Sequence, residues 1–125
     1  MILDKKKILE YQQNEPPYLM IDYAEEIIPG VSSKGYRDLK DDEWFFKVHW
    51  KKDPNMPGML QIEALIQMSA LCILCLPGNK GKIMYLSSAN KLKFFKKIIP
   101  GDRLNIESKV KSYKRGLATF EASGV

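Results

Sequence analysis

The sequence predicts an α+β fold in which an antiparallel sheet surrounds one long helix. Two observations carry this prediction. The mostly apolar run 57–76 begins at Pro57 and is followed by Pro77-Gly78, which is typical of a single buried helix. Alternating apolar and polar segments separated by Gly and Pro turns lie on both sides of it, which indicates antiparallel strands.

The size and composition of the chain are those of one soluble domain. Of its 125 residues, 45% are hydrophobic and 28% charged, which is enough apolar material for a core and too much for a disordered chain. Two cysteines make no disulfide framework, and with one histidine they cannot supply four zinc ligands. The N-terminus lacks a signal-peptide pattern. We therefore expect a single domain over residues 1–125 that is cytoplasmic and holds no metal.

Four elements are predicted ahead of the long helix. Asp4 can cap a short amphipathic helix, and Pro16-Pro17 ends it. The turn signal Pro29-Gly30 separates two strands, and the aromatic run 44–48 has high β-propensity. The predicted elements are a helix over 3–13 and strands over 18–28, 31–39 and 44–48.

The long helix itself allows two interpretations. A helix over 57–76 would measure about 30 Å, which is long enough to span a bilayer. It contains Gln61, Glu63, Gln67 and Ser69, and a carboxylate is costly in lipid. We therefore favour a helix buried in the protein core or in an oligomer interface.

The chain beyond residue 82 is predicted to be β-structure. Leu104, Ile106 and Val110 alternate with polar residues, so one face of their strand is exposed to water. Turn signals lie at 100–102 and 114–116. The predicted strands cover residues 83–95, 103–113 and 117–123.

Positive charge is concentrated in the C-terminal part of the chain. Residues 1–79 hold 9 Lys and Arg against 12 Asp and Glu, whereas residues 80–115 hold 11 Lys and Arg with only Asp102 and Glu107 as acids. The net charge of +9 in 80–115 attracts an anionic partner, which could be a nucleic acid or an acidic protein. The same lysines could also be the solvated face of a strand that resists edge-to-edge pairing.

Two side chains are candidates for acid–base chemistry. His49, the only histidine, lies among aromatic residues, and an apolar setting favours the neutral imidazole that can act as a base. Glu63 is the one carboxylate in the apolar helix, and burial favours the protonated form that donates a proton. Gln67 lies one turn further on and can hold the carboxyl group. The alternatives are a structural histidine and a glutamate on a narrow solvated stripe.

The start of the long helix is a third candidate site. Free N–H groups at residues 56–59 form the positive end of the helix dipole, where an oxyanion could be stabilised. Gly58 permits the close approach of a ligand. Cys72 and Cys75 form a C-x-x-C pair late in the apolar run, where we expect inert packing residues and no redox site.

The segment 48–67 resembles the active-site region of the FabZ-type 3-hydroxyacyl-[acyl-carrier-protein] dehydratases. That family has the pattern G-H-F-P-G-x-P-x-x-P-G-V-L-x-x-E-A-x-x-Q. The positions in register are His49, Pro54, Met56, Pro57, Gly58, Leu60, Glu63, Ala64 and Gln67. Further matches are 17–22 to the family's Pro-Phe-Leu-Leu-Val-Asp, 91–102 to its K-x-R-F…V-V-P-G-D strand, and 115–117 to its R-R-G-L hairpin.

The resemblance implies a hotdog fold, an antiparallel sheet wrapped around one long central helix. It implies a homodimer, alone or as three dimers in a homohexamer, whose active sites take His49 from one subunit and Glu63 from the other. The substrate would be a thioester on the phosphopantetheine arm of acyl carrier protein, with no cofactor. This acidic carrier then becomes a better partner for the basic segment than nucleic acid. The candidate docking residues are Lys91, Lys93, Lys96, Lys97 and Arg115.

The resemblance also implies a reaction, the loss of water from a 3-hydroxyacyl thioester in fatty acid or related acyl-chain biosynthesis. His49 would take the proton from C2, and Glu63 would help the 3-hydroxyl group leave as water. The residues expected to bind substrate are Gly58, Met59, Gln67 and Phe94. The first two would offer their N–H groups to the thioester oxygen as negative charge develops there, and Gln67 would orient Glu63.

The sequence departs from the family pattern at three places. Val48 replaces a glycine, Lys97 replaces a proline, and Lys51-Lys52 replaces the Pro-Gly of a tight turn beside the histidine. A family member carries another strand beyond Val125, so we expect the sequence to lack a C-terminal part. Two alternatives stay open: a hotdog acyl thioesterase, and an inactive hotdog protein that binds acyl carrier protein.

Overall fold

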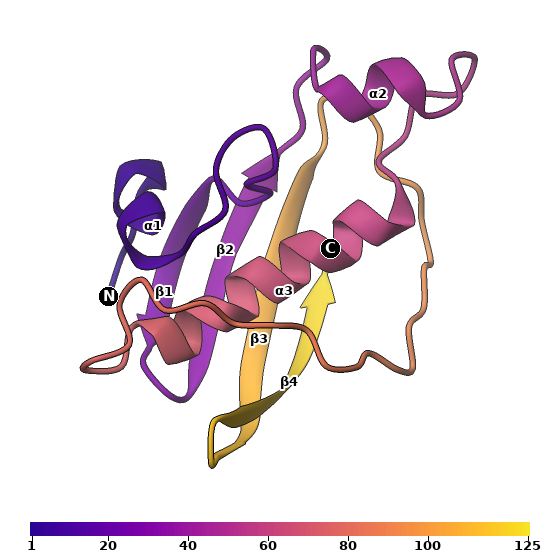
Figure 1. The fold of residues 1–125 in the computed structure, drawn as a ribbon. Coiled ribbons are helices and arrows are strands. Elements are labelled where there is room, and N and C mark those ends of the chain that lie inside the picture. The colour runs from indigo at the N-terminus through magenta and orange to yellow at the C-terminus, as the bar shows by residue number, and fades with distance from the viewer.

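The computed structural model describes all 125 residues as three helices and a four-stranded antiparallel sheet (Figure 1). The elements are α1 (Lys5–Tyr11), β1 (Tyr23–Ile28), β2 (Ser32–Asp38), α2 (Trp44–Val48), α3 (Gly58–Leu74), β3 (Arg103–Lys114) and β4 (Leu117–Gly124). The strand order is β1-β2-β3-β4, and α3 lies across one face of the sheet (Figure 1). This is the predicted α+β arrangement of an antiparallel sheet around one long helix.

The hydrophobic core lies between α3 and the sheet. Met68 and Leu71 of α3 are fully buried in one apolar cluster with Ala24 of β1 and with Leu104 and Ile106 of β3. Burial of each large apolar side chain stabilises the fold by about 1.5–3 kcal/mol. The core interpretation of the long helix is therefore confirmed, and no helix in the structure has both the length and the apolar character needed to cross a membrane.

The N-terminal helix is shorter than predicted. Asp4 caps it as expected, because its carboxylate accepts a hydrogen bond of 2.9 Å from the N–H of Lys7. Leu3 does not join the helix and instead exchanges backbone hydrogen bonds with Ala24 at the edge of the sheet. The predicted span 3–13 is thus reduced to Lys5–Tyr11.

Three of the predicted strands are present almost as expected. β2, β3 and β4 fall within about one residue of the predicted ranges 31–39, 103–113 and 117–123. The strand predicted over 18–28 begins only at Tyr23, because the backbone of Tyr18 and Met20 is bonded to the side chain of Gln67 in α3 and not to a neighbouring strand.

The aromatic run 44–48 forms the helix α2, so the predicted strand is wrong. Phe45 and Phe46 are both buried in the same core, and their rings lie 4.8 Å apart. Neighbouring side chains of a strand point to opposite faces, whereas one helical turn can direct both rings into the core. Tertiary packing therefore outweighs the β-propensity of this run.

The segment 83–95 forms no strand, which corrects the second β-prediction. A strand requires a neighbour to bond its N–H and C=O groups, and all three strand pairs of the sheet are formed by β1 to β4. The segment is irregular and exposed, with large apolar side chains such as Ile83 and Phe95 facing solvent. It runs between the end of α3 and the start of β3 outside the sheet (Figure 1).

Candidate active site

His49, the start of α3 and the segment 94–97 surround an open cavity of about 420 Å³. The two sides of the cavity are joined by a backbone hydrogen bond of 2.8 Å from Met56 to Ile98. The lining residues that matter for chemistry are His49, Trp50, Gly58, Gln61, Phe94 and Lys97. The structure therefore brings together three features that were singled out in the sequence: the histidine, the helix start and Phe94.

His49 is the C-terminal cap of α2 and is held in a defined orientation. Its backbone N–H donates to the carbonyl of Phe45 at 3.0 Å, and its Nδ1 lies 3.1 Å from the carbonyl oxygen of Asn55. A carbonyl oxygen can only accept, so Nδ1 carries the hydrogen and Nε2 has a free lone pair. This is the tautomer that a general base requires.

The departure from the family pattern at Lys51-Lys52 does not abolish the turn. These two residues occupy the centre of a turn that is closed by a 2.9 Å hydrogen bond from the N–H of Asp53 to the carbonyl of Trp50. Trp50 adopts a left-handed φ of 59°, which costs a non-glycine residue about 1–2 kcal/mol. Its ring stacks on the imidazole of His49 at a centroid distance of 4.9 Å.

The N-terminus of α3 offers two unused donors. Pro57 precedes the helix, and its carbonyl accepts from Leu60 and Gln61, while the N–H groups of Gly58 and Met59 donate to no other group of the protein. A Cβ atom at Gly58 would lie 3.1 Å from the ring of Phe94. The absence of a side chain at Gly58 thus lets Phe94 pack over the helix start, a use that the sequence did not predict.

Glu63 lies further along α3 and accepts two hydrogen bonds. Gln67 donates to one carboxylate oxygen at 2.9 Å, as the i,i+4 spacing predicted, and the hydroxyl of Tyr18 donates to the other at 3.2 Å. Burial raises the pKa of Tyr18, and the charge of Glu63 and this hydrogen bond raise it further. Glu63 itself is half-buried in the single chain, so the burial expected of a proton donor is only partial there.

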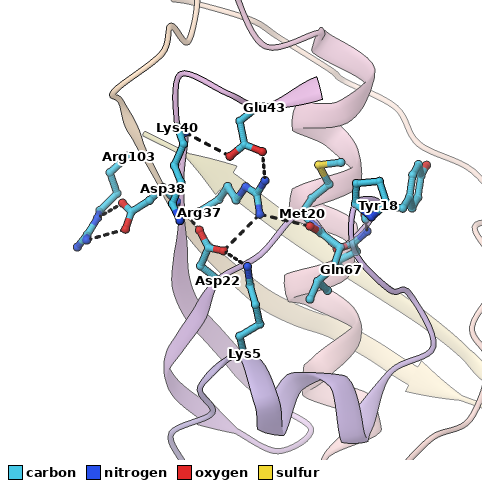
Figure 2. A network of polar contacts seen from close by, with 12 residues as sticks. Lys5, Tyr18, Met20, Asp22, Arg37, Asp38, Lys40, Glu43, Gln67 and Arg103 are labelled. Atoms are coloured by element: carbon cyan, nitrogen blue, oxygen red, sulfur yellow. Dashed lines mark hydrogen bonds and ion pairs between the residues drawn. The ribbon is translucent and has the colours of Figure 1, made fainter. Parts of the chain in front are cut away.

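Gln67 is buried and its amide group is fully bonded. Its oxygen accepts from the N–H of Met20 at 2.7 Å, and its nitrogen donates to the carbonyl of Tyr18 at 3.0 Å (Figure 2). The same nitrogen also donates to Glu63. The side chain thereby attaches the segment 18–20 to α3. It also leaves Glu63 little freedom to turn.

His49 and Glu63 do not meet within one chain. No hydrogen bond or ion pair joins them, and Glu63 is not among the residues that line the cavity at His49. A single chain therefore presents the two candidate groups in separate surroundings.

The five basic residues predicted to dock a carrier protein are all exposed. Lys96 and Lys97 line the cavity, and Lys97 pairs with Asp53 at 2.8 Å, while Lys91 and Lys93 lie in the same segment. Arg115 lies in the turn between β3 and β4, at the end of the sheet that is distant from α2 (Figure 1). It follows β3, whose 12 residues span roughly 40 Å.

Cys72 is a buried free thiol and Cys75 is a half-buried one that packs against the core, so both are packing residues as predicted. Burial raises the pKa of Cys72, and burial together with the neighbouring Cys72 raises the pKa of Cys75 to about 11. Both thiols are therefore protonated at neutral pH, and the protonated form is a poor nucleophile and metal ligand. No group of three or more His, Cys, Asp or Glu side chains is arranged to hold a metal ion.

Two residues of the site were not predicted from the sequence. Asn55 supplies the carbonyl that selects the His49 tautomer, and Tyr18 supplies the second donor to Glu63. Tyr18 is 45 positions from its partner, so no local spacing indicates the contact. The one available signal was the tyrosine itself, because the family pattern has phenylalanine at that position.

Comparison with known proteins identifies relatives over most of the chain. The model of the FabA-like domain matches residues 13–125. A 3-hydroxyacyl-[acyl-carrier-protein] dehydratase FabZ of Clostridium novyi (strain NT) is 41% identical over 114 residues, which cover 91% of this chain and 80% of that protein. The FabZ of Clostridium tetani (strain Massachusetts / E88) is 44% identical over 102 residues, which cover 82% and 72%.

Proposed function

The chain belongs to the FabA-like family, and we propose that it dehydrates 3-hydroxyacyl thioesters of acyl carrier protein to trans-2-enoyl thioesters in fatty acid or related acyl-chain biosynthesis. The observation that carries this proposal is the state of His49. A histidine with its Nδ1 hydrogen bound to a carbonyl and its Nε2 free lies at a cavity beside unused helix N–H groups.

The first half of the reaction uses these groups. The Nε2 atom of His49 takes a proton from C2 of the substrate, and the electron pair moves toward the thioester carbonyl. The N–H groups of Gly58 and Met59, at the positive end of α3, stabilise the negative charge on the thioester oxygen. Removal of one such donor typically lowers kcat by about a hundredfold or more.

The second half of the reaction breaks the bond between C3 and its hydroxyl oxygen. The enolate electron pair forms the C2=C3 double bond, and Glu63 donates the proton that converts the leaving hydroxide into water. Gln67 and Tyr18 hold the carboxyl group for this transfer. The loss of water involves no net oxidation or reduction, so we propose that no cofactor takes part.

We further propose a homodimer with shared active sites, which can assemble into a hexamer of three dimers. Glu63 and His49 are separated within one chain, and the site requires both a base and an acid. The exposed apolar side chains of the segment 83–95 support the existence of a covering surface. In the dimer, His49 of one subunit faces Glu63 of the other.

The docking surface for the acidic carrier is assigned to the lysines of the segment 91–97. Lys96 and Lys97 lie at the mouth of the cavity, so a carrier bound there can deliver its acyl thioester to His49. Arg115 lies at the other end of β3. It belongs to the docking surface only if the second subunit brings it to this cavity.

The decisive assay is the hydration of a crotonyl thioester, the reverse reaction, followed by the loss of the enoyl absorbance. We expect hydration by the wild-type protein and its loss in both His49→Ala and Glu63→Gln. Val48→Ala serves as a control, because Val48 neighbours His49 but is 74% exposed.

The two alternatives predict other results. Release of free thiol without hydration would indicate a thioesterase. Binding of acyl carrier protein without either activity would indicate an inactive member of the family, and the dehydratase proposal would then be wrong.

A further inference from the structure

We propose that Arg37 is a positioning residue that holds the two separate parts of the active site in one geometry. The inference rests on the proposed function, in which His49 is the base and Glu63 the acid. Arg37 lies in β2 and contacts neither group. Its guanidinium bridges Glu43, at the start of α2, and the segment 18–22 (Figure 2). The helix α2 orients His49, and the segment 18–22 orients Glu63.

One nitrogen of the Arg37 guanidinium bonds the residue before α2, the helix that His49 caps. Its Nη2 donates to the carboxylate of Glu43 at 2.6 Å, and the other oxygen of Glu43 accepts from the N–H of Lys40 at 3.2 Å. Glu43 is the residue immediately before α2, and His49 is the residue immediately after it. Because α2 has only five residues and Phe45 anchors it in the core, fixing Glu43 fixes the position of His49.

The other terminal nitrogen bonds the segment 18–22, which contacts Glu63 through Tyr18 and Gln67. Nη1 of Arg37 lies 3.4 Å from the carbonyl of Leu19 and 3.3 Å from the carboxylate of Asp22. Leu19 lies between the two residues, Tyr18 and Met20, that are bonded to Gln67. The chain of contacts thus runs from Arg37 through the backbone of 18–20 to Gln67, and from Gln67 to Glu63.

The bridge depends on the shape of the arginine side chain. Arg37 is 7% exposed, and its Nε has no hydrogen-bond partner, so the guanidinium is buried at a cost that two carboxylates offset only in part. Replacing a whole buried ion network by apolar side chains is often neutral for stability, whereas removing Arg37 alone would leave Asp22 and Glu43 without the guanidinium that they share. The planar fork of a guanidinium can bond partners in two directions at fixed angles, whereas the point charge of a lysine cannot.

The test compares two variants with a matched control. Arg37→Lys keeps the charge and removes the fork. Glu43→Gln keeps the size of the side chain and weakens the contact between Glu43 and Arg37. It therefore tests the bridge even if Arg37→Lys does not fold. The control is Arg103→Met, because Arg103 makes a bidentate pair with Asp38 on the exposed side of the neighbouring strand.

Two readouts separate positioning from stability. We expect both variants to lower kcat for crotonyl thioester hydration by about tenfold to a hundredfold, with KM changed less than about twofold because the substrate contacts remain. The chain has a single histidine, so NMR of the imidazole reports His49 without assignment. Its resonance is expected to shift in both variants and to stay unchanged in Arg103→Met.

The outcomes are distinguishable from a failure of the proposed function. A wild-type protein without hydration activity, but with a His49 resonance that shifts in Arg37→Lys, would overturn the function and leave the positioning role intact. An active wild type whose folded variants keep kcat and the His49 resonance would overturn the positioning role. A lower melting temperature with unchanged kcat would overturn it as well.

Discussion

Tyr18 changes the surroundings of the proposed acid by one hydroxyl group. Glu63 accepts one hydrogen bond from Gln67 in its own helix and a second from Tyr18, a residue that is 46% exposed. The family pattern has phenylalanine at this position, so the second donor distinguishes this chain from the pattern. The hydroxyl bonds the carboxylate oxygen that Gln67 does not.

Removal of this hydroxyl is expected to slow the reaction without unfolding the protein. A hydrogen bond to a charged group contributes about 1.5–3 kcal/mol, and the exposure of Tyr18 reduces this value. We therefore expect Tyr18→Phe to lower kcat by about threefold to tenfold in the hydration assay. Tyr23→Phe is the matched control, because the Tyr23 hydroxyl makes no hydrogen bond in the structure. An unchanged kcat in Tyr18→Phe would show that the second donor has no part in the reaction.

Asp22 links stability to pH. Burial alone would raise the pKa of this carboxyl group, but Lys5, the N–H of Asp38 and Arg37 together lower it below the usual value. The folded state therefore favours the ionised form. The stabilisation is fully present above the unfolded pKa of about 3.9 and is lost as the pH falls through the lower, folded value.

The corresponding measurement is urea unfolding of Asp22→Asn at several pH values. At pH 7 we expect the free energy of unfolding to fall by about 2 kcal/mol, since hydrogen bonds to a charged group are lost. The difference from the wild type should narrow below about pH 4. Asp41→Asn, at an exposed position, is the control and should leave the free energy of unfolding at pH 7 almost unchanged. A constant difference across the pH range would contradict the assignment to Asp22.

The two segments that were wrongly predicted as strands show what decides the form of an element. The run 44–48 and the segment 83–95 are both rich in β-prone residues. The first becomes a helix because Phe45 and Phe46 enter the same core, and the second stays irregular because β1 to β4 offer it no partner. Neither reason is visible in local propensity.

Gly35, in the middle of β2, lies where β1 and α3 leave no room for a side chain. A Cβ atom there would collide with the carbonyl oxygen of Tyr23 in β1 and lie 2.6 Å from the terminal methyl carbon of Met68 in α3. The absence of a side chain at this position allows the sheet and the helix to approach. No turn or left-handed backbone signal marks this glycine in the sequence.

We expect Gly35→Ala to lower the free energy of unfolding by about 2–3 kcal/mol, because overpacking forces the backbone and Met68 apart. Thermal unfolding followed by circular dichroism measures the loss. Lys34→Ala is the control, since Lys34 makes only an exposed ion pair of 3.9 Å, worth less than about 1 kcal/mol. A loss below about 1 kcal/mol in Gly35→Ala would mean that helix and sheet can separate freely at this point.

The arrangement of the whole molecule leads to the proposal of a shared site. Each chain holds His49 at the cavity and Glu63 outside its lining. It also exposes the apolar segment 83–95 on its surface. An isologous dimer would bring each base to the acid of the partner and cover this segment at the same time.

Complementation between inactive variants tests this arrangement. When His49→Ala and Glu63→Gln chains are co-expressed, about half of the dimers are mixed, and each mixed dimer has one intact site and one doubly altered site. We expect roughly a quarter of the wild-type hydration activity from the mixture and almost none from either variant alone. A mixture as inactive as its components would place both residues of each site on one chain.

A large part of the fold was predictable because it depends on local patterns. The boundaries of α3 follow from Pro57, the apolar run and Pro77, and β3 follows from the alternation that buries Leu104 and Ile106. The contact of Gln67 with Glu63 follows from the helical spacing alone. The candidate base and acid, His49 and Glu63, were identified from residue type and from their register with the family pattern.

Other features depend on which surfaces pack together. The local spacing of residues does not predict this packing. The helical form of α2 and the irregular form of 83–95 are of this kind, as are the contacts of Tyr18 and Arg37 with residues distant in sequence. The separation of His49 from Glu63 is the clearest case. The sequence indicates a base and an acid 14 positions apart, but their surroundings depend on how α2 and α3 meet the sheet. Packing of distant segments sets that geometry, because burial of shared apolar surface outweighs local preference.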